Sequence, residues 1–292
     1  MALYELHERP SLEHPVLIMV LDGWIDAGFA AATAAQTLLA GLDTFPVATF
    51  DADRLLDHRA RRPIMHLIDG VNTGLSWPGI ELRGGTDESG NDVLLLLGAE
   101  PDHAWRAFTN EVLDLAQQLG TRMVIGLGAY PATVPHTRAV SMSVTASTPE
   151  LASLSGLLRG TLDVPAGVQA ALETRCSEID LPAVGIWAQV PHYVSGEMTP
   201  YPAAALALID QLAHTGGLRL PTGTLREDAE RTRNRIDAAM SANSDHIAML
   251  RALEQRHDEQ VQAGPAVHDD LPSADELAAE VERFLRDQGT ED

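Results

Sequence analysis

Three loops in the sequence carry side chains that could bind or transform a ligand. Each loop directly follows an apolar stretch that suits a buried strand, over residues 16–21, 123–127 and 183–190. Because ligands of parallel α/β folds gather at the carboxyl ends of the strands, we expect the loops to meet in one crevice. The candidate residues are Asp22, Trp24 and Asp26 in the first loop, Tyr130, His136 and Arg138 in the second, and His192 and Tyr193 in the third.

The second loop contains the pair with the clearest chemistry. The guanidinium fork of Arg138 could hold a carboxylate or a phosphate, and His136 could act as an acid or base near neutral pH. A structural role, in which both side chains bridge loops, explains the pair equally well. The other loops have ordinary readings too, because Asp26 suits a helix cap and a proline-flanked aromatic such as Tyr193 suits packing.

Several other chemistries lack the residues they need. The chain contains no lysine, which excludes a Schiff base and a lysine-containing phosphate loop. No Gly-x-Ser-x-Gly elbow is present, and Gly126-x-Gly128 is only a fragment of a dinucleotide fingerprint. Histidines occur singly, and the one cysteine, Cys176, lies in a predicted helix. We therefore expect no metal and no cofactor, and no catalytic motif is recognisable.

The composition restricts the expected cellular location and the classes of binding partner. The net charge of −22 repels phosphate backbones, and the arginines at residues 54–62 are interleaved with aspartates, so we expect no nucleic-acid partner. A lone cysteine cannot form an intramolecular disulfide. Residues 1–13 do not resemble a signal peptide, and no apolar run reaches the length of a membrane span. The expected location is the cytoplasm, without membrane contact.

Strand and helix patterns alternate along most of the chain, which favours an α/β fold with a mostly parallel sheet. Helical patterns cover residues 26–39, 103–119, 165–178 and 202–214. Besides the three strands that precede the candidate loops, we expect strands over residues 45–50, 64–68, 92–97 and 140–145.

Two segments depart from this alternation. Residues 80–97 resemble a hairpin with a glycine-rich tip at 84–90, which would either project and be covered by another subunit or form a surface loop. From residue 222 onward, apolar residues recur at helical spacing, with Asn243 between two helices and a linker over 264–272. We expect a core domain over residues 1–221, with a hairpin insertion near 80–97, and an acidic helical appendage over 222–292.

The loops taken together resemble the proteasome assembly chaperone family of the second type, in particular its actinobacterial branch. The resemblance rests on Gly23-Trp-Ile-Asp-Ala-Gly28, on Gly128-Ala-Tyr-Pro131 with His136-Thr-Arg138, and on Pro191-His-Tyr193 with Pro200-Tyr-Pro202. It covers residues 16–220. It implies a three-layer α/β/α core similar to purine nucleoside phosphorylases and peptidyl-tRNA hydrolases, assembly often as a trimer, a C-terminal lid over residues 222–256 and an oligomerising hairpin at 84–90.

Two functions follow as alternatives. The first is an oligomeric binding and assembly module for a protein partner, which the acidic charge, the missing catalytic motif and the resemblance favour. The second is an enzyme or sensor for a small anionic metabolite, such as a nucleoside or phosphate ester, in a pocket beneath the helical lid. There Arg138 would hold the anion and His136 would act as acid or base.

Overall fold

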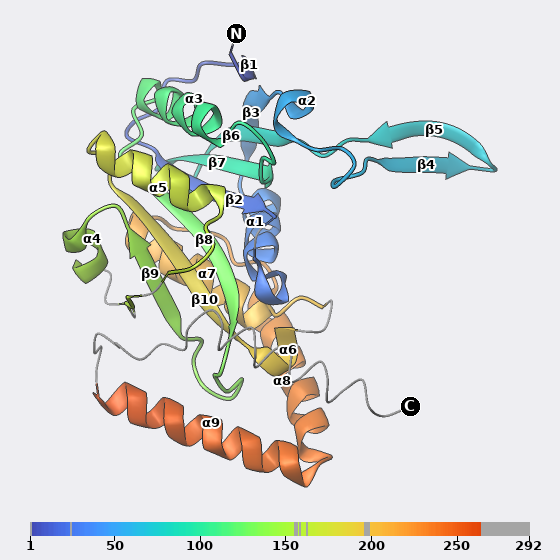
Figure 1. The fold of residues 1–292 in the computed structure, drawn as a ribbon, viewed down its shortest axis with the longest axis vertical. Helices are drawn as coiled ribbons and strands as arrows, with labels where there is room; N and C mark the ends of the chain where they lie inside the picture. The colour runs from blue at the N-terminus through green and yellow to red at the C-terminus, as the bar shows by residue number, and fades with distance from the viewer. Residues whose placement is uncertain are drawn as a thin grey trace.

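The computed structural model describes residues 2–263 except 24, 155, 156, 158, 162 and 196–198. Trp24, the expected linker and the last part of the expected appendage therefore lie outside the described residues. The described chain forms an eight-stranded sheet and a separate two-stranded one (Figure 1). Across the large sheet the strands are β1 (Tyr4–Leu6), β3 (Thr44–Phe50), β6 (Ile80–Thr86), β7 (Asp92–Ala99), β2 (Val16–Asp22), β8 (Met123–Ala132), β10 (Ala183–Pro191) and β9 (Met142–Ala146).

The four central strands, β7, β2, β8 and β10, run parallel, and antiparallel strands extend the sheet on both sides. The central strands are continuous apolar runs because helices cover them on both faces. In β2, Ile18 faces one core cluster and Leu17 and Met19 face the other, as the alternation of a strand requires.

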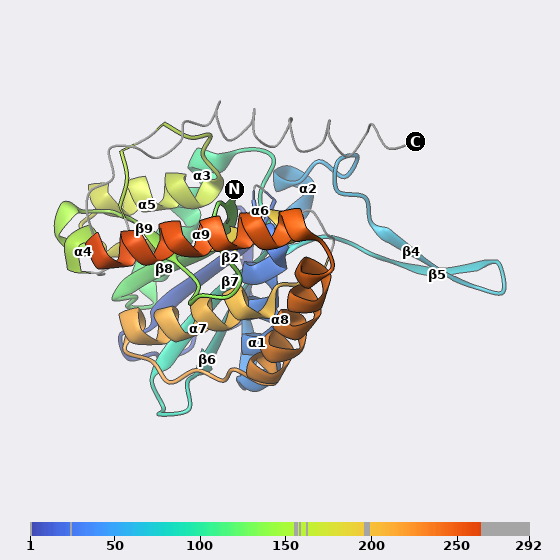
Figure 2. The ribbon, with the colours of Figure 1, turned by 90° about the horizontal axis from the view of Figure 1, so that it is seen from below.

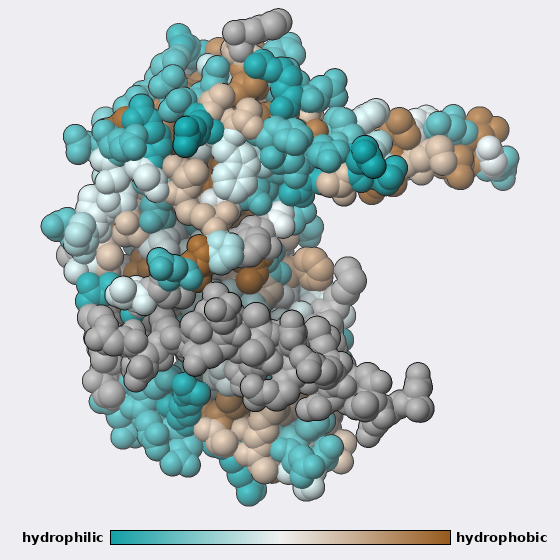
Figure 3. Space-filling model, viewed as in Figure 1, coloured by the Kyte–Doolittle hydropathy of each residue, from teal (hydrophilic) through white to brown (hydrophobic). Residues whose placement is uncertain are grey.

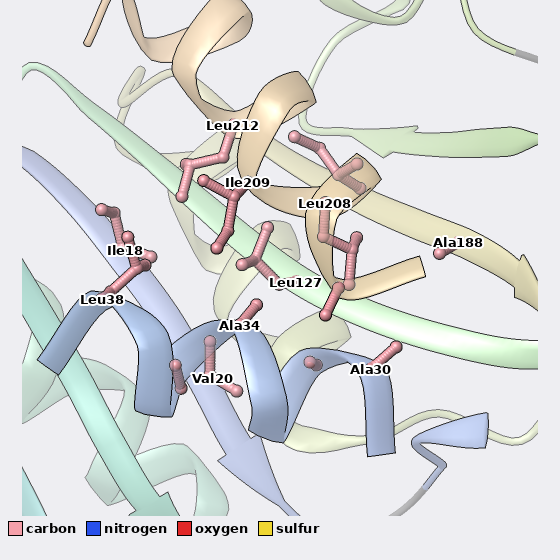
Figure 4. Packing of buried hydrophobic residues seen from close by; sticks show 14 of the residues in the cluster. Ile18, Val20, Ala30, Ala34, Leu38, Leu127, Ala188, Leu208, Ile209 and Leu212 are labelled. Carbon is pink, nitrogen blue, oxygen red and sulfur yellow. The ribbon is translucent and has the colours of Figure 1, made fainter. Parts of the chain in front are cut away.

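Helices form a layer on each face of the sheet. On one face lie α1 (Ala30–Gly41), which follows the short 3-10 turn η1 (Ala27–Phe29), and α7 (Pro202–Gly216). Alanines of α1, including Ala30 and Ala34, face Leu208 and Ile209 of α7 above the strands (Figure 4). On the other face lie α3 (Trp105–Gln118) and α5 (Val168–Glu178). The predicted three-layer α/β/α fold is confirmed.

The hairpin predicted over residues 80–97 exists, and its strands belong to the large sheet. Its strands, β6 and β7, pair antiparallel inside the large sheet, where Leu94, Leu95 and Leu96 are fully buried. Its turn is anchored as well, because the carboxylate of Asp87 accepts hydrogen bonds from the backbone N–H groups of Asn91 and Arg219. Of the two readings left open for the glycine-rich tip, a projecting edge or a surface loop, the exposed residues 88–91 fit a surface turn at the end of paired strands.

A second, projecting hairpin is formed by β4 (Ile64–Ile68) and β5 (Val71–Ser76), which extend away from the core as an isolated ribbon (Figures 1 and 2). Its turn is Asp69-Gly70, and both residues have positive φ, 50° and 80°. This is the backbone of a type I′ turn, the usual two-residue hairpin connection. Residues 64–68 are thus a strand, as predicted, but not one of the core sheet.

Two long helices follow the core, as the sequence predicts. Helix α8 (Leu225–Ser241) packs on α7, and α9 (Ser244–Ala263) follows after a break at Asn243. We call α8 and α9 the helical arm. The remaining helices are the short α2 (Ala52–Leu55), α4 (Pro149–Leu154) and α6 (His192–Ser195). None of the described helices combines the length and apolarity needed to cross a lipid bilayer.

Candidate functional site

His136 lies at the centre of the predicted site, in the loop between β8 and β9, and its side chain is buried. Its backbone N–H donates to the hydroxyl oxygen of Tyr193, 2.8 Å away, and its Nδ1 lies 2.7 Å from the same oxygen. Its Nε2 lies 3.0 Å from Oδ1 of Asp237 in α8. The carboxylate of Asp237 can only accept, so Nε2 carries a proton, and in the neutral imidazole Nδ1 then accepts the hydroxyl proton of Tyr193. His136 therefore joins the loop, α6 and the arm.

Arg138 fastens the same loop to the second helix of the arm. Its Nε and Nη2 donate to the two carboxylate oxygens of Asp258, at 2.8 and 2.9 Å, and its Nη1 donates to Glu254 at 3.0 Å. The hydrogen bonds to Asp258 raise the pKa of the Arg138 guanidinium, and in return they lower the pKa of the Asp258 carboxyl. Thr137 also donates to Glu254. The guanidinium of Arg138, which we predicted to bind an anionic ligand, is thus bonded to two carboxylates of the chain itself, those of Asp258 and Glu254.

The first loop lies next to the second and contacts the start of α7. The carboxylate of Asp26 accepts hydrogen bonds from the N–H groups of Ala31 and Ala32, at 2.8 and 2.9 Å, and so caps α1 as predicted. Burial raises the pKa of Asp26, although these hydrogen bonds oppose the shift. Asp26 also forms an isolated bridge with Ala129 of β8. The carbonyl of Gly28 accepts a hydrogen bond from the N–H of Tyr201 at 2.8 Å.

The remaining predicted residues are placed differently. Tyr130 points to the α5 face of the sheet, where its hydroxyl lies 3.0 Å from Ser143 Oγ and accepts from Gln189 at 2.9 Å. Asp22 is exposed, and its carbonyl accepts from Arg61. The ring of His192 lies edge-on to that of Tyr193, with centroids 5.3 Å apart. The structure thus brings together His136, Arg138 and Tyr193 beneath the arm, with His192 beside them, and leaves Tyr130 on the other face.

The polar side chains of this junction are bonded to one another in the structure. Burial raises the pKa of Tyr193, so its hydroxyl stays protonated and is not an activated nucleophile. Burial likewise raises the pKa of Cys176 to about 12. No group of three His, Cys, Asp or Glu side chains among the described residues could hold a metal ion. The cavity on the α5 side, lined by Glu100, Gln169 and Trp187 among others, has a volume of about 30 Å³, room for a single water.

Among the described residues, exposed large apolar side chains are concentrated on the projecting hairpin and at its base, which sequence reasoning missed as a site. Along the hairpin, apolar residues appear in brown and tan on a mostly hydrophilic surface (Figure 3). They occupy both faces of the ribbon, since Met65 pairs with Leu75 on one face and Ile68 with Val71 on the other. The sequence signal for this hairpin is the Asp69-Gly70 turn between two apolar stretches. The exposed apolar residues of the hairpin and its base are Ile64, Met65, Leu67, Ile68, Val71, Leu75 and Trp77.

Comparison with known families settles the relationship. The PAC2 family model matches residues 20–240, most of the chain. This chain belongs to the PAC2 family. No curated protein matches it. The resemblance to proteasome assembly chaperones of the second type, predicted from the loops, is confirmed.

Solved structures of actinobacterial PAC2 relatives share the fold over most of their length. A Mycobacterium tuberculosis protein of unknown function is 39% identical, with a TM-score of 0.82, and the match covers 90% of each chain. A PAC2 family protein of Streptomyces avermitilis is 35% identical over 81% of this chain and 99% of that one, with a TM-score of 0.72. A Mycobacterium tuberculosis proteasome-assembly chaperone homologue is 31% identical over 80% and 99%, with a TM-score of 0.74.

Proposed function

We propose that this PAC2 protein is an oligomeric assembly module, in which copies of the chain associate through the β4–β5 hairpin and the assembled form binds a protein partner in the cytoplasm. The observation that carries the proposal is the hairpin itself. It presents apolar side chains to water on both faces, at the end of a ribbon that no described helix covers. Contiguous exposed apolar surface of this kind marks interaction sites.

The free energy gained by burying the apolar side chains of the hairpin is large enough to support association. Fully burying a large apolar side chain contributes roughly 1.5–3 kcal/mol. Seven such residues, each already partly covered, could together contribute on the order of 10 kcal/mol, enough to exceed much of the entropic cost of association. A two-stranded hairpin is also only marginally stable alone in water, so a partner would stabilise it. Because both faces are apolar, the partner should enclose the hairpin rather than lie on one side of it.

A chaperone-like role is consistent with the family. One of the relatives, 31% identical over most of this chain, is described as a proteasome-assembly chaperone homologue. The partner we propose is therefore a protein subunit that is itself assembled into a larger complex. Capture of a stoichiometric protein from lysate under native conditions by the full-length chain tests this part, and recovery of the chain alone would contradict it.

The test of hairpin-mediated association uses two matched variants. Ile68→Asp replaces a hairpin residue that is 63% exposed, and Val261→Asp makes the same kind of change at a residue on α9 that is 67% exposed. Measured by light scattering on the eluting protein, the Ile68 variant should shift to the mass of the monomer, while the Val261 variant should keep the wild-type mass. Equal masses for all three proteins would refute the hairpin as the interface.

The alternative function, binding of an anionic metabolite beneath the arm, requires a change in the contacts of Arg138. Arg138 makes two hydrogen bonds to Asp258 and a third bond to Glu254, so an anion would have to displace both carboxylates. Such a ligand would compete with the arm. It should therefore increase amide exchange in α9 while raising the melting temperature, a combination that a protein-binding role does not produce.

A further inference from the structure

A hollow lies at the base of the projecting hairpin, outside the junction of His136 and the arm. Its volume is about 380 Å³, and its lining residues are Asp51, Ala52, Asp53, His58 and Trp77. The first three come from α2 and the residue before it, and Trp77 follows β5 directly. We call this hollow the root notch.

The lining of the root notch has the chemistry of a cation site. The side chain of Asp53 is 90% exposed, and Trp77 is 57% exposed. The ring of His58 stands edge-on to Trp77, with centroids 5.0 Å apart, while its Nε2 lies 3.0 Å from Oδ1 of Asp53. His58 thus contacts both the indole and the Asp53 carboxylate, while the Asp51 carboxylate caps α2 and lies 4.0 Å from Nε of Arg54. An aromatic face beside carboxylates attracts a guanidinium or ammonium group and repels an anion.

We propose that the root notch receives the side chain of Arg62 from a second copy of the chain. This rests on the proposed association through the hairpin, and it names a polar anchor of that interface. The chain contains no lysine, so a cation supplied by another copy must be arginine. Trp and Arg are the residues most enriched among those that dominate binding energy at protein interfaces.

Arg62 is the arginine that best fits this role. It is exposed, and it stands two residues before the first residue of β4, so it lies at the base of the hairpin. Within the described part of the chain it makes no hydrogen bond or ion pair. Its neighbour Arg61, in contrast, donates to the carbonyl of Asp22 and pairs with Asp102. In a symmetric oligomer every copy supplies one Arg62 and one root notch, so the contact can repeat at each interface.

A charge exchange tests the proposal on the full-length chain. Asp53→Arg and Arg62→Asp each place like charges at the contact, and the association constant measured by sedimentation should fall at least about tenfold in each variant. The double variant Asp53→Arg/Arg62→Asp restores opposite charges and should recover most of the wild-type association. Arg256→Asp, the same charge change at an exposed arginine on α9, away from the hairpin and the root notch, should leave the association within about threefold of the wild type.

The outcomes separate this inference from the function on which it rests. If the wild type and all variants associate equally, or if the double variant is weaker than both single variants, the Arg62 contact is wrong. The Ile68→Asp comparison then decides separately whether association through the hairpin holds. If the wild type is a monomer throughout, both proposals fail. Circular dichroism of each variant shows whether it is folded, and Asp53→Asn, which removes the charge without adding bulk, should show a weaker loss in the same direction.

Discussion

The imidazole Nε2 of His136 lies 3.0 Å from the carboxylate Oδ1 of Asp237, although 101 residues separate them in the chain. The contact joins the β8–β9 loop to the helical arm, and Arg138 repeats the connection with Asp258, 120 residues away. Two neighbouring side chains of one loop thus hold both helices of the arm against the core. His136 and Arg138, two of the residues predicted to bind a ligand, hold the arm against the core in this structure.

The hydroxyl of Tyr193 should contribute measurably to stability. Tyr193→Phe removes the group that accepts the His136 N–H and bonds its Nδ1, and it leaves both atoms buried without a partner. We expect the free energy of unfolding in urea to fall by about 1–3 kcal/mol. Tyr4→Phe, at a half-buried tyrosine whose hydroxyl makes no hydrogen bond to a described residue, should change it by less than about 0.5 kcal/mol. Equal effects would contradict the role of Tyr193.

Arg138 should restrain α9. Arg138→Ala removes the hydrogen bonds to Asp258 and Glu254, and we expect faster amide exchange along α9 with little change in the central strands. The helix should stay attached in part, because Leu253 is buried. Arg256→Ala removes the same charge from an exposed position on α9 and should leave exchange unchanged. Unaltered protection in the Arg138 variant would show that the ion pairs do not hold the helix.

Asp26 should make stability depend on pH in a defined direction. Burial raises its pKa above the usual value for an aspartate, so its contribution to stability is fully present below that usual value and is lost as pH rises through the folded pKa. Asp26→Asn keeps an oxygen to cap α1 but cannot ionise. Relative to the wild type, this variant should therefore gain stability as pH is raised from 4 toward 7. Urea unfolding at several pH values measures the difference, and a difference independent of pH would contradict the assignment.

Gly28 should be required for the contact between the first and third loops. Its φ is 59°, and a Cβ on it would lie 2.7 Å from the Cβ of Tyr201. We expect Gly28→Ala to destabilise the protein by about 2–4 kcal/mol, from a left-handed backbone and a steric clash together. Gly120→Ala is the matched control, because its φ is 73° with nothing within 4 Å of the added atom, so only the left-handed backbone contributes, at about 1–2 kcal/mol. If Gly28→Ala lowers the free energy of unfolding no more than Gly120→Ala does, the two loops are not in close contact at Gly28.

Much of the core could be predicted from the sequence because its patterns report burial. Residues 16–21 of β2 are all apolar because helices cover both faces of the strand. The side chains of α1 that face α7 are mostly alanines because the two helices pack closely. The capping role of Asp26 and the break at Asn243 follow from local side-chain chemistry in the same way. Buried strands, helix caps and helix breaks could be predicted because each depends on residues close together in the sequence or on the burial of one face of an element.

The sequence could not predict which residues contact one another across the fold. Residues 64–68 show the composition of a core strand, yet they are exposed in the single chain, and composition does not distinguish burial in the core from burial between copies. Asp237 and Asp258 look like the solvated face of an arm helix. Their pairing with His136 and Arg138 depends on where the arm docks, which no local pattern encodes.

The central claim is that copies of this chain assemble through the projecting hairpin, and the molar mass in solution tests it most directly. Sedimentation equilibrium of the full-length wild type at micromolar concentration should give a multiple of the chain mass of 31.4 kDa. Removal of residues 64–76, with the flanking ends joined by a short glycine linker, should return a folded protein of single-chain mass. A wild type that sediments at 31.4 kDa at every concentration, or an oligomer that persists without the hairpin, would contradict the account.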